Sequence, residues 1–206
     1  MIETYLRPIY QYCVVNPIAR KIQFSPIKIT CFSCFTGILV APALLINLPK
    51  IAIVLLLISG FLDTLDGTVA RMTDKTSNMG GVLDIVSDRI VELAVMIGLY
   101  FVDPSDRALG TLAMLGSCYL CITSFLVVGI FSPNQSEKGF HYSPGLIERT
   151  EAFIFFIVMI LWPRYFSLLA YLFAGLVLLT SFLHIKAFNR KLVLLPSSAL
   201  PNRELA

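Results

Sequence analysis

Long runs of apolar residues, separated by short polar stretches, occupy most of this chain. A helix needs about 17 to 25 residues to cross the hydrocarbon core of a bilayer, and six runs meet that requirement. Charged residues make up only 14% of the chain, against about 25% in a typical soluble domain. We therefore expect an all-α integral membrane protein with six transmembrane helices, at residues 27–47, 50–73, 78–102, 108–132, 147–163 and 165–188.

An amphipathic segment precedes the predicted bundle. Residues 2–22 mix apolar and aromatic side chains with arginine and lysine, which predicts a helix lying on the membrane surface and interrupted at Pro8 and Pro17. No internal repeat is visible. We expect a single membrane domain over residues 1–206, made of an interfacial segment (1–22), the six-helix bundle (27–189) and a tail (192–206).

The positive charges predict the orientation of the bundle. With both termini on one side, all but three of the 16 Lys and Arg residues lie on that side, the exceptions being Lys50, Arg107 and Arg164. The positive-inside rule then places both termini in the cytosol, and we expect an inner membrane of bacterial type. The net charge of +3 is too small to indicate a nucleic acid partner.

Acidic residues are scarce, yet four aspartates gather near the cytosolic ends of the second and third runs. Asp63 and Asp66 are three residues apart and Asp84 and Asp88 are four apart, so each pair shares one helix face. Two adjacent antiparallel helices would point all four carboxylates at a common place, where they would repel strongly unless cations held them. Oxygen ligands favour hard cations such as Mg²⁺ or Mn²⁺. Ordinary surface acids at a solvated helix end do not account for this spacing.

Small residues continue the two acidic faces. Gly67, Ala70 and Gly80 remove bulk where the helices would meet, which serves either close helix packing or room for a planar ligand group. Arg71 adds a fixed positive charge suited to a phosphate, with a salt bridge to a neighbouring aspartate as the alternative.

Two cysteine pairs have the C-x-x-C spacing of many zinc sites. They lie within apolar runs, where a thiolate cluster would lack polar support, so we interpret them as small packing residues. The four residues are Cys31, Cys34, Cys118 and Cys121.

The aspartates and small residues together follow the pattern D-x-x-D-G-x-x-A-R-x8-G-x-x-x-D-x-x-x-D over residues 63–88. This pattern resembles the signature of the class I CDP-alcohol phosphatidyltransferases, and every fixed position matches. The resemblance implies a surface helix followed by six spans, and an enzyme of phospholipid biosynthesis. Members transfer a phosphatidyl group from a CDP-linked lipid to a small alcohol and release CMP, while a few transfer a CDP-linked alcohol to a lipid.

The resemblance also implies roles for individual residues. It implies two divalent cations at Asp63, Asp66 and Asp84, and a homodimer. Asp88 matches the general base for the acceptor hydroxyl and can also touch a metal.

Positions around the cytidine and diphosphate match as well. Those in the signature are Gly67, Ala70, Arg71 and Gly80. The family's first span opens with Pro-Asn-x-x-Thr, which matches here at Pro26 and Thr30 but has Ile27 in place of the asparagine.

The acceptor is predicted from positive charges on the cytosolic side. A phosphate-bearing acceptor, inositol phosphate or glycerol phosphate, needs cationic residues, and Arg149 and Lys138 are the candidates. Arg149 opens the fifth run between Glu148 and Glu151, in a segment similar to one in inositol-phosphate-type members. Alternatively, these cationic residues serve only to orient the protein in the membrane by the positive-inside rule. Serine or another amino alcohol is the alternative acceptor.

Two other function classes remain open from the residues alone. An ion-coupled carrier also uses intramembrane acids, but its repeated halves are not seen here. An inactive membrane scaffold would be free to lose an aspartate, whereas the motif is complete.

Overall fold

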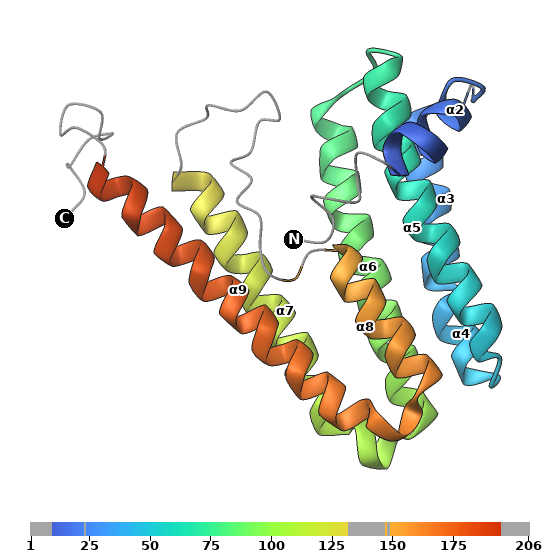
Figure 1. Ribbon diagram of the computed structural model, residues 1–206, viewed down its shortest axis with the longest axis vertical. Coiled ribbons are helices and arrows are strands. Elements are labelled where there is room, and N and C mark those ends of the chain that lie inside the picture. The colour runs from blue at the N-terminus through green and yellow to red at the C-terminus, as the bar shows by residue number, and fades with distance from the viewer. Residues whose placement is uncertain (1–9, 23, 132–146, 148, 195–206) are drawn as a thin grey trace.

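The structure is a computed structural model that describes residues 10–22, 24–131, 147 and 149–194. The described residues form helices and no strand, as expected for an all-α chain (Figure 1). In chain order the elements are η1 (Gln11–Val15), α2 (Asn16–Ala19), α3 (Pro26–Ile38), α4 (Val40–Leu45), α5 (Pro49–Met72), α6 (Asn78–Val102), α7 (Pro104–Phe131), α8 (Arg149–Leu161), η2 (Pro163–Tyr165) and α9 (Phe166–Leu194).

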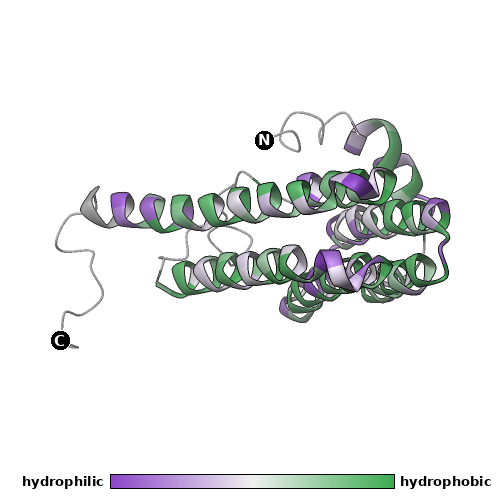
Figure 2. Ribbon diagram, turned by 90° about the horizontal axis from the view of Figure 1, so that it is seen from below, coloured by the Kyte–Doolittle hydropathy of each residue, from purple (hydrophilic) through white to green (hydrophobic). Residues whose placement is uncertain are grey.

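Four helical segments of the described chain are long and apolar enough to cross a membrane: Pro26–Leu45, Pro49–Met72, Pro104–Phe131 and Pro163–Arg190. Hydrophobic residues cover most of these helices (Figure 2). Many of their large apolar side chains are exposed. Outward apolar surface of this extent is expected of helices that face lipid. The chain is therefore a helical membrane protein.

The remaining two predicted spans do not meet both conditions: one is long but charged, and the other is too short. Helix α6 has 25 residues, but it carries the charged residues Asp84, Asp88, Arg89 and Glu92. Helix α8 has 13 residues, fewer than a straight span needs. It begins part-way along α6 rather than beside the end of that helix (Figure 1).

The first predicted span is not one continuous helix. Helix α3 ends at Ile38 and α4 begins at Val40, with Leu39 between them at φ −65° and ψ −11°. Pro42 explains the break, because its ring nitrogen cannot donate to the carbonyl of Ile38 four residues earlier. Helical structure then ends at Leu45, two residues before the predicted limit of 47.

The surface segment is helical from Tyr10 to Ala19, and its predicted interruption at Pro17 is wrong. The turns before the proline widen into the π-helix η1, in which the Asn16 N–H donates to the Gln11 carbonyl. Such a wider turn carries the helix past a residue that has no N–H. Pro8 lies outside the described residues.

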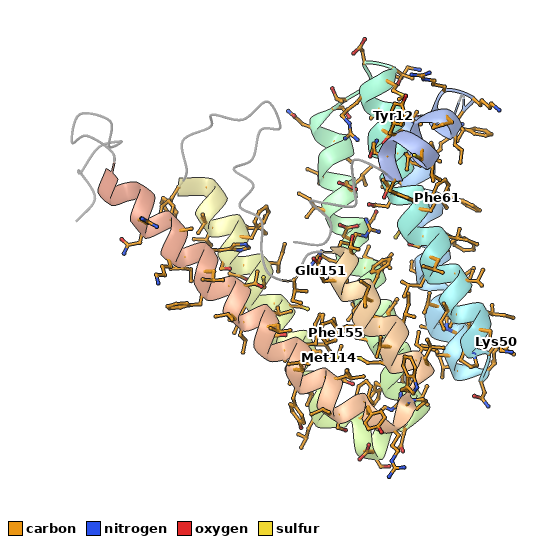
Figure 3. All side chains as sticks on the ribbon, in the orientation of Figure 1. Tyr12, Lys50, Phe61, Met114, Glu151 and Phe155 are labelled. Carbon is orange, nitrogen blue, oxygen red and sulfur yellow. The ribbon has the colours of Figure 1, made fainter. Side chains whose placement is uncertain are left out.

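One face of this segment packs on the bundle while the other stays exposed. Val15 and Ala19 are buried against Leu65 and Val69 near the end of α5. Tyr12 is 77% exposed and lies at one end of the molecule, opposite Lys50 (Figure 3). This amphipathic arrangement suits a helix at a membrane surface.

Helices α3, α5 and α6 form a tightly joined group. The Ser33 hydroxyl donates to the Ser59 carbonyl at 2.7 Å, and the Ser59 hydroxyl donates to the Ser33 carbonyl at 2.9 Å. A Cβ on Gly37 would overlap a methyl group of Val91. Buried hydroxyl pairs and small residues of this kind hold membrane helices together, and here they fix α5 and α6 to α3.

Helices α7 and α9 form a second group, in contact along much of their length (Figure 1). Helix α8 joins this group to the first through a core that includes Met114, Phe156 and Phe173. Met114 and Phe155 lie where α7, α8 and α9 meet (Figure 3), and Phe155 packs on Phe173 with ring centroids 5.5 Å apart.

A buried arginine closes the end of the bundle opposite η1. Arg107 is 4% exposed, donates to the carbonyl of Leu99 at 2.9 Å and stacks over the ring of Phe166 at 4.6 Å. It thereby joins α6, α7 and α9. Beside it, Asp103 accepts hydrogen bonds from the Ser105 hydroxyl and the Asp106 N–H, and these lower the pKa of Asp103.

Gly98→Ala is expected to destabilise the protein by about 1–3 kcal/mol, because the new methyl group would lie 2.8 Å from the Cα of Ala41 on α4. Gly116→Ala is the matched control, since nothing lies within 4 Å of its Cβ position. Thermal unfolding in detergent measures both variants. Equal melting temperatures would contradict the close α4–α6 packing.

Candidate active site

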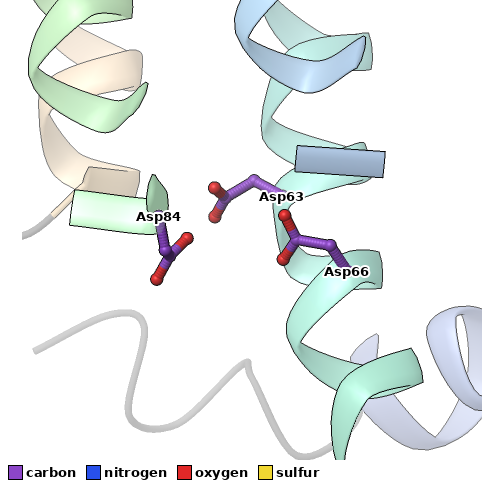
Figure 4. Close-up of side chains that lie close together, drawn as sticks. All are labelled: Asp63, Asp66 and Asp84. Atoms are coloured by element: carbon purple, nitrogen blue, oxygen red, sulfur yellow. The ribbon is translucent and has the colours of Figure 1, made fainter. Parts of the chain in front are cut away.

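Three aspartates from two helices meet at one place. Asp63 and Asp66 project from α5 and Asp84 from α6, and one ligand atom from each lies within 4.8 Å of the others (Figure 4). No other group of three or more such ligands is found in the part of the chain that the structure describes. The two C-x-x-C pairs therefore do not form one there.

The chemistry of these three residues fits a hard cation. Asp66 is 4% exposed, and its Oδ2 atom has no hydrogen-bond partner among the described residues. A buried carboxylate oxygen without a partner is costly, and a divalent cation is a ligand that would satisfy it. Three carboxylates so close would otherwise repel.

The start of α6 sets the position of Asp84. Ser77 is the N-cap of this helix, and its Oγ accepts a hydrogen bond from the Gly80 N–H at 3.0 Å. A Cβ on Gly80 would lie 3.2 Å from that oxygen. The small residue at position 80 therefore accommodates the helix cap, whatever else approaches it.

Asp88 lies one turn beyond Asp84 and makes a different contact. Its carboxylate pairs with the guanidinium of Arg149 at the start of α8, and the same guanidinium pairs with Asp63. Arg149 also lies over the ring of Phe153 at 5.2 Å. The fourth aspartate is thus joined to the other three through an arginine from a distant part of the sequence.

Helix α5 places Arg71 next to the carboxylates. Its guanidinium lies 3.3 Å from where a Cβ on Gly67 would be, and it donates to the Thr68 hydroxyl at 3.3 Å. Its charge acts on Asp84 across the helix pair. Ala70 is half-buried on the same helix. The absent side chain at position 67 therefore makes room for Arg71 itself.

The start of α3 approaches the same place. Thr30 is 5% exposed, donates to the Pro26 carbonyl at 3.1 Å and lies beside the Asp66 carboxylate. Ile27, where the signature of the first span has asparagine, is 40% exposed. Pro26 and Thr30 thus lie near the acidic cluster.

Lys138 lies outside the described residues. Two other features near the cluster are not indicated by the motif. Arg89 and Glu92 form an ion pair of 2.8 Å along α6, which their spacing of three would have suggested. Gln11 donates to Thr68 at 2.6 Å, and no local signal reveals a partner 57 residues away.

The sequence matches the profile of the CDP-alcohol phosphatidyltransferase family over residues 24–184. It is 29% identical to the inner membrane protein YnjF of Escherichia coli, over 86% of this chain and 88% of that protein. It is 30% identical to a phosphatidylinositol phosphate synthase of Corynebacterium glutamicum, over 70% of this chain and 68% of the other. An archaetidylinositol phosphate synthase of Methanothermobacter thermautotrophicus is 31% identical, over 68% of each chain.

The fold agrees with these matches. The crystal structure of a Mycobacterium tuberculosis phosphatidylinositol phosphate synthase with CDP-DAG bound superposes with a TM-score of 0.70 at 22% identity. The match covers 85% of this chain and 93% of that one. The chain therefore belongs to the CDP-alcohol phosphatidyltransferase family, the membrane transferases of phospholipid biosynthesis.

Proposed function

We propose that this enzyme transfers the phosphatidyl group of CDP-diacylglycerol to a phosphate-bearing alcohol, with inositol phosphate as the favoured acceptor, and releases CMP. The observation that carries the choice of acceptor is the Arg149 guanidinium between Asp63 and Asp88. The hydroxyl of the acceptor must reach the proposed base, Asp88. A phosphate on the same acceptor would then lie close to the Arg149 guanidinium, which is suited to bind it. Two of the matched relatives are named as inositol phosphate lipid synthases.

Two divalent cations, Mg²⁺ or Mn²⁺, are proposed to bind at the aspartates. Asp63, Asp66 and Asp84 supply the ligand atoms that lie together, and Asp88 is the fourth ligand predicted from the sequence. Bound there, the cations would neutralise the diphosphate and the charge that develops on the departing CMP.

Asp88 is proposed as the general base. In the transfer, the acceptor oxygen bonds to the phosphorus that carries diacylglycerol, and the bond from that phosphorus to the CMP oxygen breaks. The acceptor proton passes to the Asp88 carboxylate. Arg149, paired with that carboxylate, would favour its ionised form and orient it towards the acceptor.

The CDP group is proposed to lie along the start of α3 and the facing ends of α5 and α6. Arg71 would bind the diphosphate, since its charge is fixed beside the carboxylates. The residues that would line the nucleotide are Pro26, Thr30, Gly67, Ala70 and Gly80.

A panel of acceptors tests the proposal. Purified enzyme with CDP-diacylglycerol and Mg²⁺ is given inositol phosphate, glycerol phosphate, serine or ethanolamine, and CMP release is measured. We expect the highest kcat/KM with inositol phosphate. Equal or better turnover with serine would overturn the choice of a phosphate-bearing acceptor, and it would leave the reaction class intact.

Arg149→Gln is expected to raise KM for the phosphate-bearing acceptor at least about 30-fold, because removing one partner of a buried charged contact costs about 2 kcal/mol or more. Arg149→Lys should have a KM between those of the wild type and Arg149→Gln, since lysine keeps the charge but lacks the planar guanidinium. Arg164→Gln, at the opposite end of the bundle, is the control. A KM for the acceptor that does not change in Arg149→Gln would remove Arg149 from the acceptor site.

We infer one domain over residues 1–206, six spans with both termini in the cytosol, and a homodimer. Helix α2 and the α5–α6 connection lie at one end of the structure, and the α4–α5, α6–α7 and α8–α9 connections lie at the other, which supports this orientation (Figure 1). Helices α6 and α8 would cross inside the bundle, where their charged residues face protein.

A further inference from the structure

The Thr68 hydroxyl lies at the centre of a buried hydrogen-bond group. It donates to the Thr64 carbonyl at 2.8 Å, and it accepts from the Gln11 amide at 2.6 Å and from the Arg71 guanidinium at 3.3 Å. A hydroxyl offers one donor and two acceptor sites, so its capacity is fully used. Thr68 is 2% exposed, which leaves little room for water to replace any of these partners.

This arrangement restricts where the Arg71 side chain can lie. One of its guanidinium nitrogens is held by Thr68, and another rests against the open face of Gly67. Arg71 is itself exposed, and these contacts reduce the number of rotamers that its long side chain can sample. Thr68 is one of the variable positions of the family signature, and its role here does not follow from the motif.

Gln11 brings the surface helix into the same group. It is the first residue of η1, and its amide also approaches the Asn16 side-chain oxygen at 3.4 Å. Val15 and Ala19, one and two turns further on, anchor this helix on Leu65 and Val69 of α5. The Gln11–Thr68 contact therefore links the interfacial segment to the helix that carries the signature arginine.

We propose that Gln11 and Thr68 are positioning residues for Arg71, and that through them the docked surface helix holds this guanidinium ready for the diphosphate of the CDP-lipid. This inference rests on the proposed function, since it takes Arg71 to bind the diphosphate. In this role neither residue would contact the substrate itself. They order the Arg71 side chain before the substrate binds, so that less conformational entropy is lost on binding.

Thr68→Val is the central test, because valine keeps the shape of threonine and removes all three hydrogen bonds. We expect KM for CDP-diacylglycerol to rise about tenfold and kcat to change by less than about threefold, the pattern for lost ground-state binding. Thr68→Ser retains the hydroxyl and is expected to restore the wild-type KM. Gln11→Met, of similar length without the amide, should raise the same KM about threefold.

A double substitution separates positioning from simple packing. If Gln11 acts through Thr68, Gln11→Met combined with Thr68→Val has the KM of Thr68→Val alone, whereas independent effects would multiply. In an Arg71→Ala background neither substitution should change KM further. Thermal unfolding of each variant without substrate provides the second measurement.

Three results would overturn the inference: an unchanged KM in folded Thr68→Val, multiplied effects in the double variant, or a lower melting temperature with no change in KM. Failure of the proposed function is distinct from these. It would be seen in the wild-type protein, as no CMP release from CDP-diacylglycerol with any acceptor.

Discussion

Asp88→Asn is expected to lower kcat for CMP release by about 10²- to 10⁴-fold, the usual contribution of a positioned general base. The amide keeps the size of the carboxylate but cannot accept the acceptor proton. Arg149 would retain its pairing with Asp63, so the bundle should stay folded. Mn²⁺ binding should be largely kept, because the three carboxylates that lie together are untouched.

Asp74→Asn provides the matched control. Asp74 is exposed in the α5–α6 connection, and its φ of 52° is a conformation that asparagine also adopts readily. We expect wild-type turnover from this variant. Wild-type turnover from Asp88→Asn would remove Asp88 as the base, and a collapse in both variants would indicate damage to the α5–α6 pair instead.

Asp66→Asn is expected to weaken Mn²⁺ binding at least about 100-fold. Removing a residue that only hydrogen-bonds to a metal ligand already lowers metal affinity about 10- to 100-fold, and removing the ligand itself costs more. Asp66 is the most deeply buried of the three clustered aspartates, and the unpartnered Oδ2 atom is the feature that a cation would satisfy. Electron paramagnetic resonance of added Mn²⁺ measures the affinity without relying on turnover. CMP release should be lost in parallel.

Removing the metal from the unaltered enzyme should have the same effect. Exhaustive chelation is expected to abolish CMP release, and added Mg²⁺ or Mn²⁺ to restore it. Asp103→Asn, at the other end of the bundle, should bind Mn²⁺ as the wild type does. Activity that survives chelation, or an unchanged Mn²⁺ affinity in Asp66→Asn, would contradict the metal assignment.

Helix periodicity was sufficient to predict the acidic cluster. Residues three or four apart share a face, so Asp63, Asp66 and Asp84 could be placed together once their two helices were taken as neighbours. The limits of α5 and α6 also lie within a residue of their predicted positions, because long apolar runs between polar breaks define helix ends well.

Contacts between distant segments could not be predicted in this way. The sequence predicts that Asp88 joins the other carboxylates directly, whereas in the structure it pairs with Arg149. These two residues are 61 positions apart, and helix periodicity says nothing about contacts over such a separation. The hydrogen bond from Gln11 to Thr68 is hidden for the same reason. Pro42 is a local signal for the helix break that precedes it, but it lies within a long apolar run that predicts one continuous span.

The division of the bundle into two groups has a consequence for how such an enzyme could diversify. The proposed donor chemistry lies on α3, α5 and α6, and paired serine hydroxyls join the first two of these helices. The guanidinium proposed for the acceptor lies on α8. Exchanging α8 and the helices packed on it would alter which head group is made and leave the nucleotide machinery in place. A chimaera that carries α7 to α9 of a serine-using relative is therefore a rational route to a new lipid product.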